Sequence, residues 1–167
     1  MKKLFLFAAC FLVVLYACNK TGEKPNVAVS ATIDGTDKTF NTDDSLGFKN
    51  TDTVYSATVT AASDASATAD QLELFIASPK KLAPGTYALT ETWTPPYEPL
   101  IVYKPGGSNN FADDYVVDYT GEHPAEIIIT AISSTGIQGT FDGVLVNAAN
   151  NGTTKTFTNG KFTVGTP

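Results

Sequence analysis

Residues 27–40, VAVSATIDGTDKTF, decide the fold of this chain. Every second residue from 27 to 33 is apolar, and polar or small residues lie between them, which is the period of a strand with one buried face. Asp34-Gly35 follows, and this dipeptide is typical of a type I′ turn because both central residues of that turn need a positive φ. Counting back from the turn pairs Val29 with Phe40. The stretch therefore predicts an antiparallel hairpin with one apolar face.

The same two-residue period recurs along most of the remaining chain, and no segment has a convincing helical period. Polar residues 42–53 are predicted to form a loop, and TWTPPYEP at 92–99 a stiff loop, because proline cannot donate to a ladder. About nine or ten strands result, which predicts an all-β domain, an antiparallel β-sandwich. A closed or partly open calycin-like β-barrel is the alternative. The strands expected after the first hairpin are 54–62, 71–77, 86–91, 100–104, 115–120, 126–133, 137–147 and two segments around Phe157 and Phe162.

Two asparagine-glycine pairs organise the C-terminal strands. Asn151-Gly152 predicts a two-residue hairpin that pairs Val146 with Phe157. Phe157 and Phe162 are separated by an odd number of residues, so a regular strand would place them on opposite faces. Asn159-Gly160, which lies between them, therefore predicts either a last tight hairpin or a β-bulge.

The first eighteen residues have the layout of an export signal. Lys2 and Lys3 precede the apolar run Leu4–Ala17, which would rise only about 21 Å as a helix and is too short for a hydrocarbon core of about 30 Å. A small residue before Cys18 fits bacterial lipoprotein processing, in which the thiol is lipidated and the chain is cut before it. We expect residues 1–17 to be the signal peptide, 18–26 the lipidated cysteine with a tether, and 27–167 a single β domain.

Composition excludes several function classes. The chain contains 11 lysines, no arginine and 17 acidic residues, a net charge of −6, and removal of the leader lysines makes it more negative still. Such a surface does not suit nucleic acid. Cys10 leaves with the leader and Cys18 is consumed by lipid, so neither a disulfide nor a thiol nucleophile is expected.

Several short motifs are spread along the chain: a leader ending in Cys18-Asn19-Lys20, Ala31-Thr32-Ile33-Asp34-Gly35, Gly85-Thr86-Tyr87, the glycine-spaced segment 137–143 and Asn159-Gly160-Lys161-Phe162. Together they resemble the motifs of uncharacterised lipoproteins of Bacteroidota. Turn glycines and core aromatics make up these motifs, so the resemblance implies an envelope location and a β fold and carries no active-site residue. It leaves open whether the domain lies in the periplasm or on the cell surface.

Aromatic residues near the proline-rich segment are the first binding candidates. Trp93, Tyr97 and Tyr103 lie among the prolines at 95, 96, 99 and 105, which would hold the rings in a stiff frame. A flat ring can bury its face against the C–H side of a sugar at little rotamer cost. The alternative is that Trp93 covers one end of the core.

The acidic residues and the single histidine are better explained by solvated turns than by chemistry. One acidic set is Asp113, Asp114, Asp118 and Glu122, and a looser one is Asp34, Asp37, Asp43 and Asp44; neither has EF-hand spacing, and no metal or other cofactor is expected. His123 precedes a proline in an apparent turn, without a nucleophile elbow elsewhere. No residue is expected to be catalytic.

The sequence thus predicts a lipid-anchored cell-envelope protein, an outer-membrane lipoprotein on the periplasmic or the surface side. Its β domain is expected to be a non-enzymatic binding module for a glycan or a partner protein. Two alternatives stay open. One is a carrier of an apolar ligand, which needs an enclosed cavity of several hundred cubic ångströms. The other is a hydrolase that uses two carboxylates facing each other across a cleft.

Overall fold

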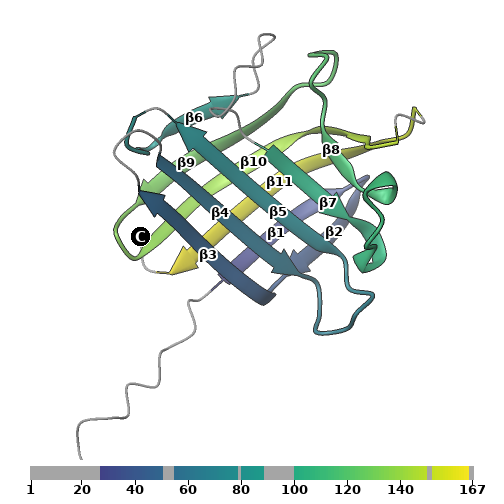
Figure 1. Cartoon of the computed structure of the whole chain (residues 1–167), viewed down its shortest axis with the longest axis horizontal. Coiled ribbons are helices and arrows are strands. Elements are labelled where there is room, and N and C mark those ends of the chain that lie inside the picture. The colour runs from purple at the N-terminus through teal and green to yellow at the C-terminus, as the bar shows by residue number, and fades with distance from the viewer. Residues whose placement is uncertain (1–26, 51–54, 79, 89–99, 150–151, 166–167) are drawn as a thin grey trace, which may run out of the picture.

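A computed structural model describes residues 27–50, 55–78, 80–88, 100–149 and 152–165 (Figure 1). This part of the chain contains strands and two short 3₁₀ helices, η1 (Pro105–Gly107) and η2 (Phe111–Asp113). The described residues include no helix that is long and apolar enough to cross a membrane. The strands are β1 (Val27–Ile33), β2 (Thr36–Phe40), β3 (Thr42–Asn50), β4 (Tyr55–Ala62), β5 (Gln71–Ser78), β6 (Gly85–Ala88), β7 (Leu100–Lys104), β8 (Tyr115–Val117), β9 (Ala125–Ile132), β10 (Gly136–Asn147) and β11 (Thr154–Gly165).

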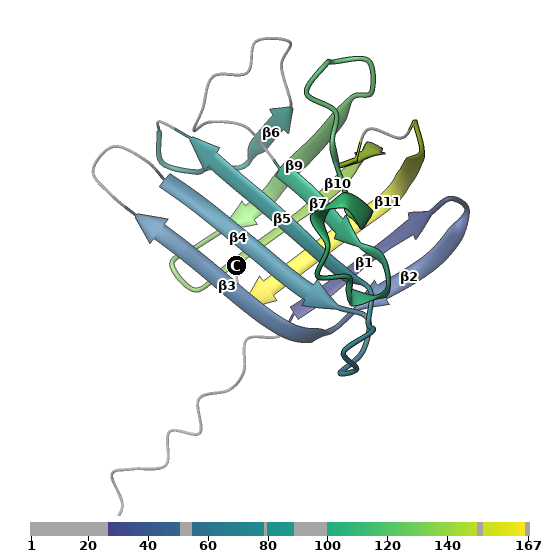
Figure 2. The same ribbon diagram turned by 45° about the vertical axis from the view of Figure 1, so that its right-hand side comes forward.

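All the strands belong to one antiparallel sheet, which confirms the all-β prediction. Its order is β2-β1-β11-β10-β8-β7-β5-β4-β3, and β10 also pairs with β9, which in turn pairs with β6. The long sheet curls back on itself, so that β3, β4, β5 and β7 cross in front of β1, β11 and β10 (Figures 1 and 2). One nearly closed, barrel-like sheet thus provides both of the facing layers that a sandwich would build from two.

The first hairpin has the predicted register. Val29 pairs with Phe40 and Ile33 with Thr36 across the Asp34-Gly35 turn. Asp34 and Gly35 have φ values of 49° and 80°, which is the positive φ that the turn requires. Val29 and Phe40 are both buried, so the apolar face of this hairpin contributes to the core as expected.

Two sequence predictions about strand extent are wrong. Residues 42–50, predicted as loop, form strand β3, which in the described sheet pairs only with β4. An edge strand needs one ladder of backbone hydrogen bonds and tolerates polar residues, so its composition hides it. The strand predicted over 115–120 ends at Val117, because the Asp118 carboxylate accepts hydrogen bonds from the backbone N–H groups of Thr120 and His123 and turns the chain.

The C-terminal hairpin differs from the prediction in register. Val146 pairs with Thr154 and not with Phe157, so the connection is longer than a two-residue turn at Asn151-Gly152. The predicted device between Phe157 and Phe162 is a bulge: the β11 register shifts against both β10 and β1, and Asn159 has a φ of 55°. The extra residue turns both phenylalanines inward.

Large apolar side chains fill the space between the two layers of the curled sheet. Tyr103 packs edge to face on Phe157, with ring centroids 5.6 Å apart. The glycines of β10 and β11 make room for the rings, since a Cβ at Gly139 would lie 2.6 Å from the Phe162 ring. The largest fully buried side chains are Phe40, Phe141, Phe157, Phe162, Leu72, Leu74, Ile76, Ile101, Ile127, Ile129, Ile137 and Leu145.

Strand β9 is covered fully on only one of its two faces. Ile127 and Ile129 are buried in the core, whereas Ile128, on the opposite face, is half-buried. The outer face of β9 therefore borders solvent, together with the outer faces of β10 and β11. It is on this face that the candidate site lies.

Candidate functional site

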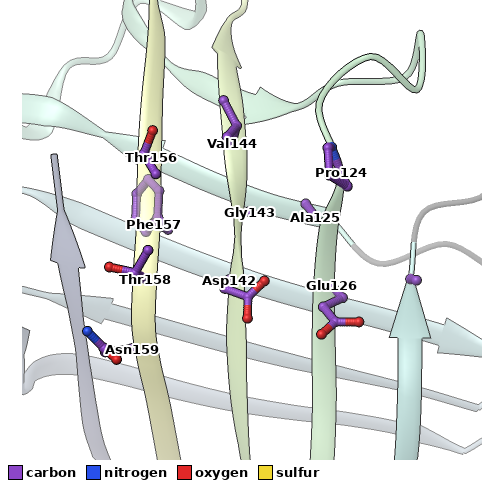
Figure 3. A pocket seen from close by; sticks show the side chains of 11 residues that line it. Pro124, Ala125, Glu126, Asp142, Gly143, Val144, Thr156, Phe157, Thr158 and Asn159 are labelled. Carbon is purple, nitrogen blue, oxygen red and sulfur yellow. The ribbon is translucent and has the colours of Figure 1, made fainter.

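The outer face of β9, β10 and β11 carries a hollow of about 520 Å³ (Figure 3). The hollow is open to solvent. Its charged and hydroxyl side chains project from the outer face of the three strands, whereas the apolar side chains that alternate with them project into the core. The hollow is lined by Ala88, Pro124, Ala125, Glu126, Asp142, Gly143, Val144, Thr156, Phe157, Thr158 and Asn159.

Small residues and backbone irregularity explain why the sheet is hollowed here. Gly143 pairs with Ala125, and a Cβ at Gly143 would lie 2.5 Å from the Cβ of Ala125, so the two strands approach closely without an outward side chain between them. On the other side, the β11 bulge places Thr158 and Asn159 opposite the single residue Asp142. A bulge bends its strand and re-aims the adjacent side chains, as it does beside many binding sites.

Glu126 and Asp142 are the two charged groups among the described residues that line the hollow. They are directly opposite each other in the ladder between β9 and β10, and both side chains project from the same face (Figure 3). Asp142 is exposed and Glu126 is half-buried. Neither carboxylate forms a hydrogen bond or an ion pair within the part of the chain that the structure describes. Like charges in directly opposed positions destabilise a sheet.

The remaining polar groups of the hollow come from β11. Thr156 and Thr158 contribute hydroxyl groups, and Asn159 contributes a side-chain amide that lies 3.4 Å from the hydroxyl of Thr32 on β1. No lysine is among the lining residues of this hollow. The two carboxylates of the hollow can therefore accept hydrogen bonds, and the hydroxyls and the amide can both donate and accept them. The carboxylates give the hollow a negative charge.

The predicted aromatic candidates are only partly described. Tyr103 has a 3% exposed side chain and belongs to the core, so its ring has no free face for a sugar. Trp93 and Tyr97 lie outside the described residues, as does the lipidation candidate Cys18. The aromatic platform at 93 and 97 therefore stays a prediction.

Tyr103 instead joins a polar cluster with Lys38 and Asp70. The Lys38 ammonium forms an ion pair with Asp70 and lies 3.0 Å from the Tyr103 hydroxyl, which donates to Asp70 at 2.9 Å. The N–H of Gly106 donates to the second Asp70 oxygen at 2.7 Å. Burial acts to raise the pKa of Asp70, but these hydrogen bonds outweigh it and hold that pKa below its ordinary value. Every member has a partner, which indicates a structural role.

The acidic residues near His123 are divided between two places. Ligand atoms of Asp118, Glu122 and His123 lie within 4.8 Å of one another, but the Asp118 carboxylate already accepts three hydrogen bonds that hold its own turn. Burial acts to raise the pKa of Asp118, and these hydrogen bonds lower it below its ordinary value. Asp114 is buried elsewhere and has one oxygen without a hydrogen-bond partner. Burial raises its pKa.

The other acidic set is not assembled into a site. Asp34 pairs with Lys155 at 2.7 Å, and Asp37 accepts a hydrogen bond from Thr32. The side chains of Asp43 and Asp44, on β3, lie outside what the structure describes.

The pairing of Glu126 with Asp142 was not among the sites predicted from the sequence. Both occupy polar positions of predicted strands, which is a signal that each points outward. Their pairing depends on the register between β9 and β10, which contains a shift between Gln138 and Gly139 and so cannot be counted from a turn.

A comparison of the chain with protein-family models, curated proteins and solved structures finds no match.

Proposed function

We propose that this chain is a lipid-anchored protein of the bacterial cell envelope, an outer-membrane lipoprotein whose β domain binds a partner protein or a glycan at the hollow on β9, β10 and β11. The observation that carries the binding role is the hollow itself, where two carboxylates without a partner among the described residues meet three further polar side chains. Binding sites are concavities in which a few polar groups converge. The leader that ends at Cys18 supports the anchor.

The carrier of an apolar ligand is not proposed, because aromatic and branched side chains occupy the interior of the curled sheet. The hydrolase is a second candidate, since Glu126 and Asp142 lie opposite each other as an acid pair must. Solvent reaches both carboxylates, however. A hydrolase needs two different environments, one that keeps the general acid protonated at neutral pH and one that keeps its partner ionised. The hollow suits binding better than catalysis.

Photo-crosslinking in intact cells tests this role. A photoreactive phenylalanine analogue at Thr158, inside the hollow, should capture a defined envelope component from the full-length lipoprotein. The control carries the same analogue at Thr60 on β4, in the other layer of the sheet. Identical crosslinks from both positions, or none from Thr158, would contradict the proposal. Turnover of glycoside substrates that is lost in Glu126→Gln would favour the hydrolase instead.

A further inference from the structure

We propose that the hollow receives an arginine side chain of a partner protein, with its guanidinium bridging Glu126 and Asp142. This inference rests on the proposed function and names the chemistry of the occupant. The two carboxylates face each other across neighbouring strands, and neither has a hydrogen-bond or ion-pair partner among the described residues.

No lysine among the described residues forms an ion pair with Glu126 or Asp142. The three ion pairs of the described part of the chain are Lys38–Asp70, Lys104–Asp114 and Lys155–Asp34, and all are elsewhere. Lys161 on β11 pairs in register with Thr140, two positions along β10 from Asp142, and forms no ion pair with either carboxylate. Opposed like charges destabilise a sheet, so a cation that binds between the two carboxylates is attracted by both and also relieves their repulsion.

The geometry of the pair favours guanidinium over ammonium. Residues directly opposite in an antiparallel ladder have Cα atoms about 4.5–5.5 Å apart, so their carboxylates form two neighbouring acceptors. A guanidinium is flat, carries five N–H donors in a fixed fork and can serve two carboxylates at once, whereas an ammonium is a compact and strongly hydrated point charge. A neutral sugar would hydrogen-bond to the carboxylates but would leave their repulsion in place.

The rest of the hollow suits the segment that carries the arginine. Gly143, Ala125 and Val144 line the hollow beside the acid pair and offer apolar surface to the aliphatic part of the side chain. Thr158 and Asn159 offer donors and acceptors for the backbone of the same segment. Because this chain contains no arginine, a second copy of it cannot supply the guanidinium, and the partner must be a different protein.

A titration followed by amide NMR tests this inference on the purified mature lipoprotein in detergent. The probes are argininamide, lysinamide, calcium chloride and methyl glucoside at matched ionic strength. Argininamide should shift the amide signals of Gly143 and Thr158 with saturation in the millimolar range. Glu126→Gln or Asp142→Asn should weaken this binding about tenfold, which is the loss of one charge-assisted hydrogen bond. Glu73→Gln, which removes the same charge from outward-facing β5, should leave it unchanged.

The possible results distinguish a failure of the arginine assignment from a failure of the proposed binding role. Shifts in the hollow with methyl glucoside or calcium but not with argininamide would overturn the arginine assignment and leave the binding role intact. Argininamide binding that survives both substitutions would also overturn it. If no probe perturbs the hollow and crosslinking from Thr158 also fails, the proposed function fails with it. Equal affinity for lysinamide and argininamide would refute the bridging geometry.

Discussion

The cluster of Lys38, Asp70 and Tyr103 should contribute measurably to stability, because it ties β2 to the paired strands β5 and β7, with which β2 shares no ladder. Lys38 is on β2, an edge of the strand order, Asp70 precedes β5 and Tyr103 is on β7. Asp70→Asn keeps the shape of the side chain but removes the charge that accepts from Lys38 and from the N–H of Gly106. The Lys38 ammonium would then stay partly desolvated without its ion partner.

The magnitude follows from the exposure of the pair. Hydrogen bonds to charged groups contribute about 1.5–3 kcal/mol each when buried, and the side chains of Lys38 and Asp70 are 32% and 17% exposed, so solvent offsets part of the loss. We expect Asp70→Asn to lower the free energy of unfolding by about 2–3 kcal/mol at pH 7. For a domain of this size the melting temperature should fall by about 4–12 °C.

The effect of Asp70→Asn on stability should depend on pH in a definite direction. The folded-state pKa of Asp70 lies below its ordinary value, so its stabilising effect is complete above the pKa of the unfolded chain, about 3.9, and is lost as the pH falls through the folded value. Urea unfolding at pH 7 and at pH 3 checks this, with Glu73→Gln as a control expected to change stability by less than about 0.5 kcal/mol. A variant as stable as wild type at pH 7, or a deficit that is the same at both pH values, would refute the reasoning.

Three further predictions concern the backbone, a buried acid and the anchor. Gly160→Ala should destabilise the fold by at least about 1–3 kcal/mol in urea unfolding, because its Cβ would lie 2.1 Å from the carbonyl oxygen of Phe141; wild-type stability would contradict this. Asp114→Asn should stabilise the chain by about 1–2 kcal/mol at pH 7, since one oxygen of this buried group has no partner and Lys104 is 3.9 Å from the other. Burial raises the folded-state pKa of Asp114, so ionisation destabilises the fold and this gain should vanish as the pH falls below the unfolded value of about 3.9; an unchanged gain at pH 3 would show another cause. Cys18→Ala should move the protein from the membrane fraction to the soluble fraction and abolish the lipid mass on the mature N-terminus, whereas membrane retention of the variant would contradict the anchor.

Much of the fold could be predicted because its signals are local. Alternation and the Asp34-Gly35 turn determine the first hairpin, including the pairing of Val29 with Phe40. The odd spacing of Phe157 and Phe162 predicted either a tight hairpin or a β-bulge at Asn159-Gly160, and the structure has a bulge there. β3 could not be predicted in this way, because an edge strand carries no requirement for an apolar face.

The candidate site depended on information that the sequence does not contain. The rings of Trp93 and Tyr97 stay a sequence prediction, whereas Tyr103, from the same segment, is buried beside Asp70. Glu126 and Asp142 each occupy an outward position in the alternation of their strand. Their pairing could not be obtained by counting from the turn between β9 and β10, because the register shifts between that turn and the pair. Their proximity is a property of the ladder between two strands.

The sequence by itself determined the period of the strands, the position of the first turn and the negative charge, since each depends only on local pattern or composition. The lipid anchor stays a prediction from the leader. Only the tertiary structure decided that a single sheet curls into both layers, that Lys38 meets Asp70 across the strand order, and that two carboxylates share one hollow. The physical reason is that ladder register and sheet curvature arise from bulges and close-packed glycines acting between distant strands, and no local pattern records which strands those are.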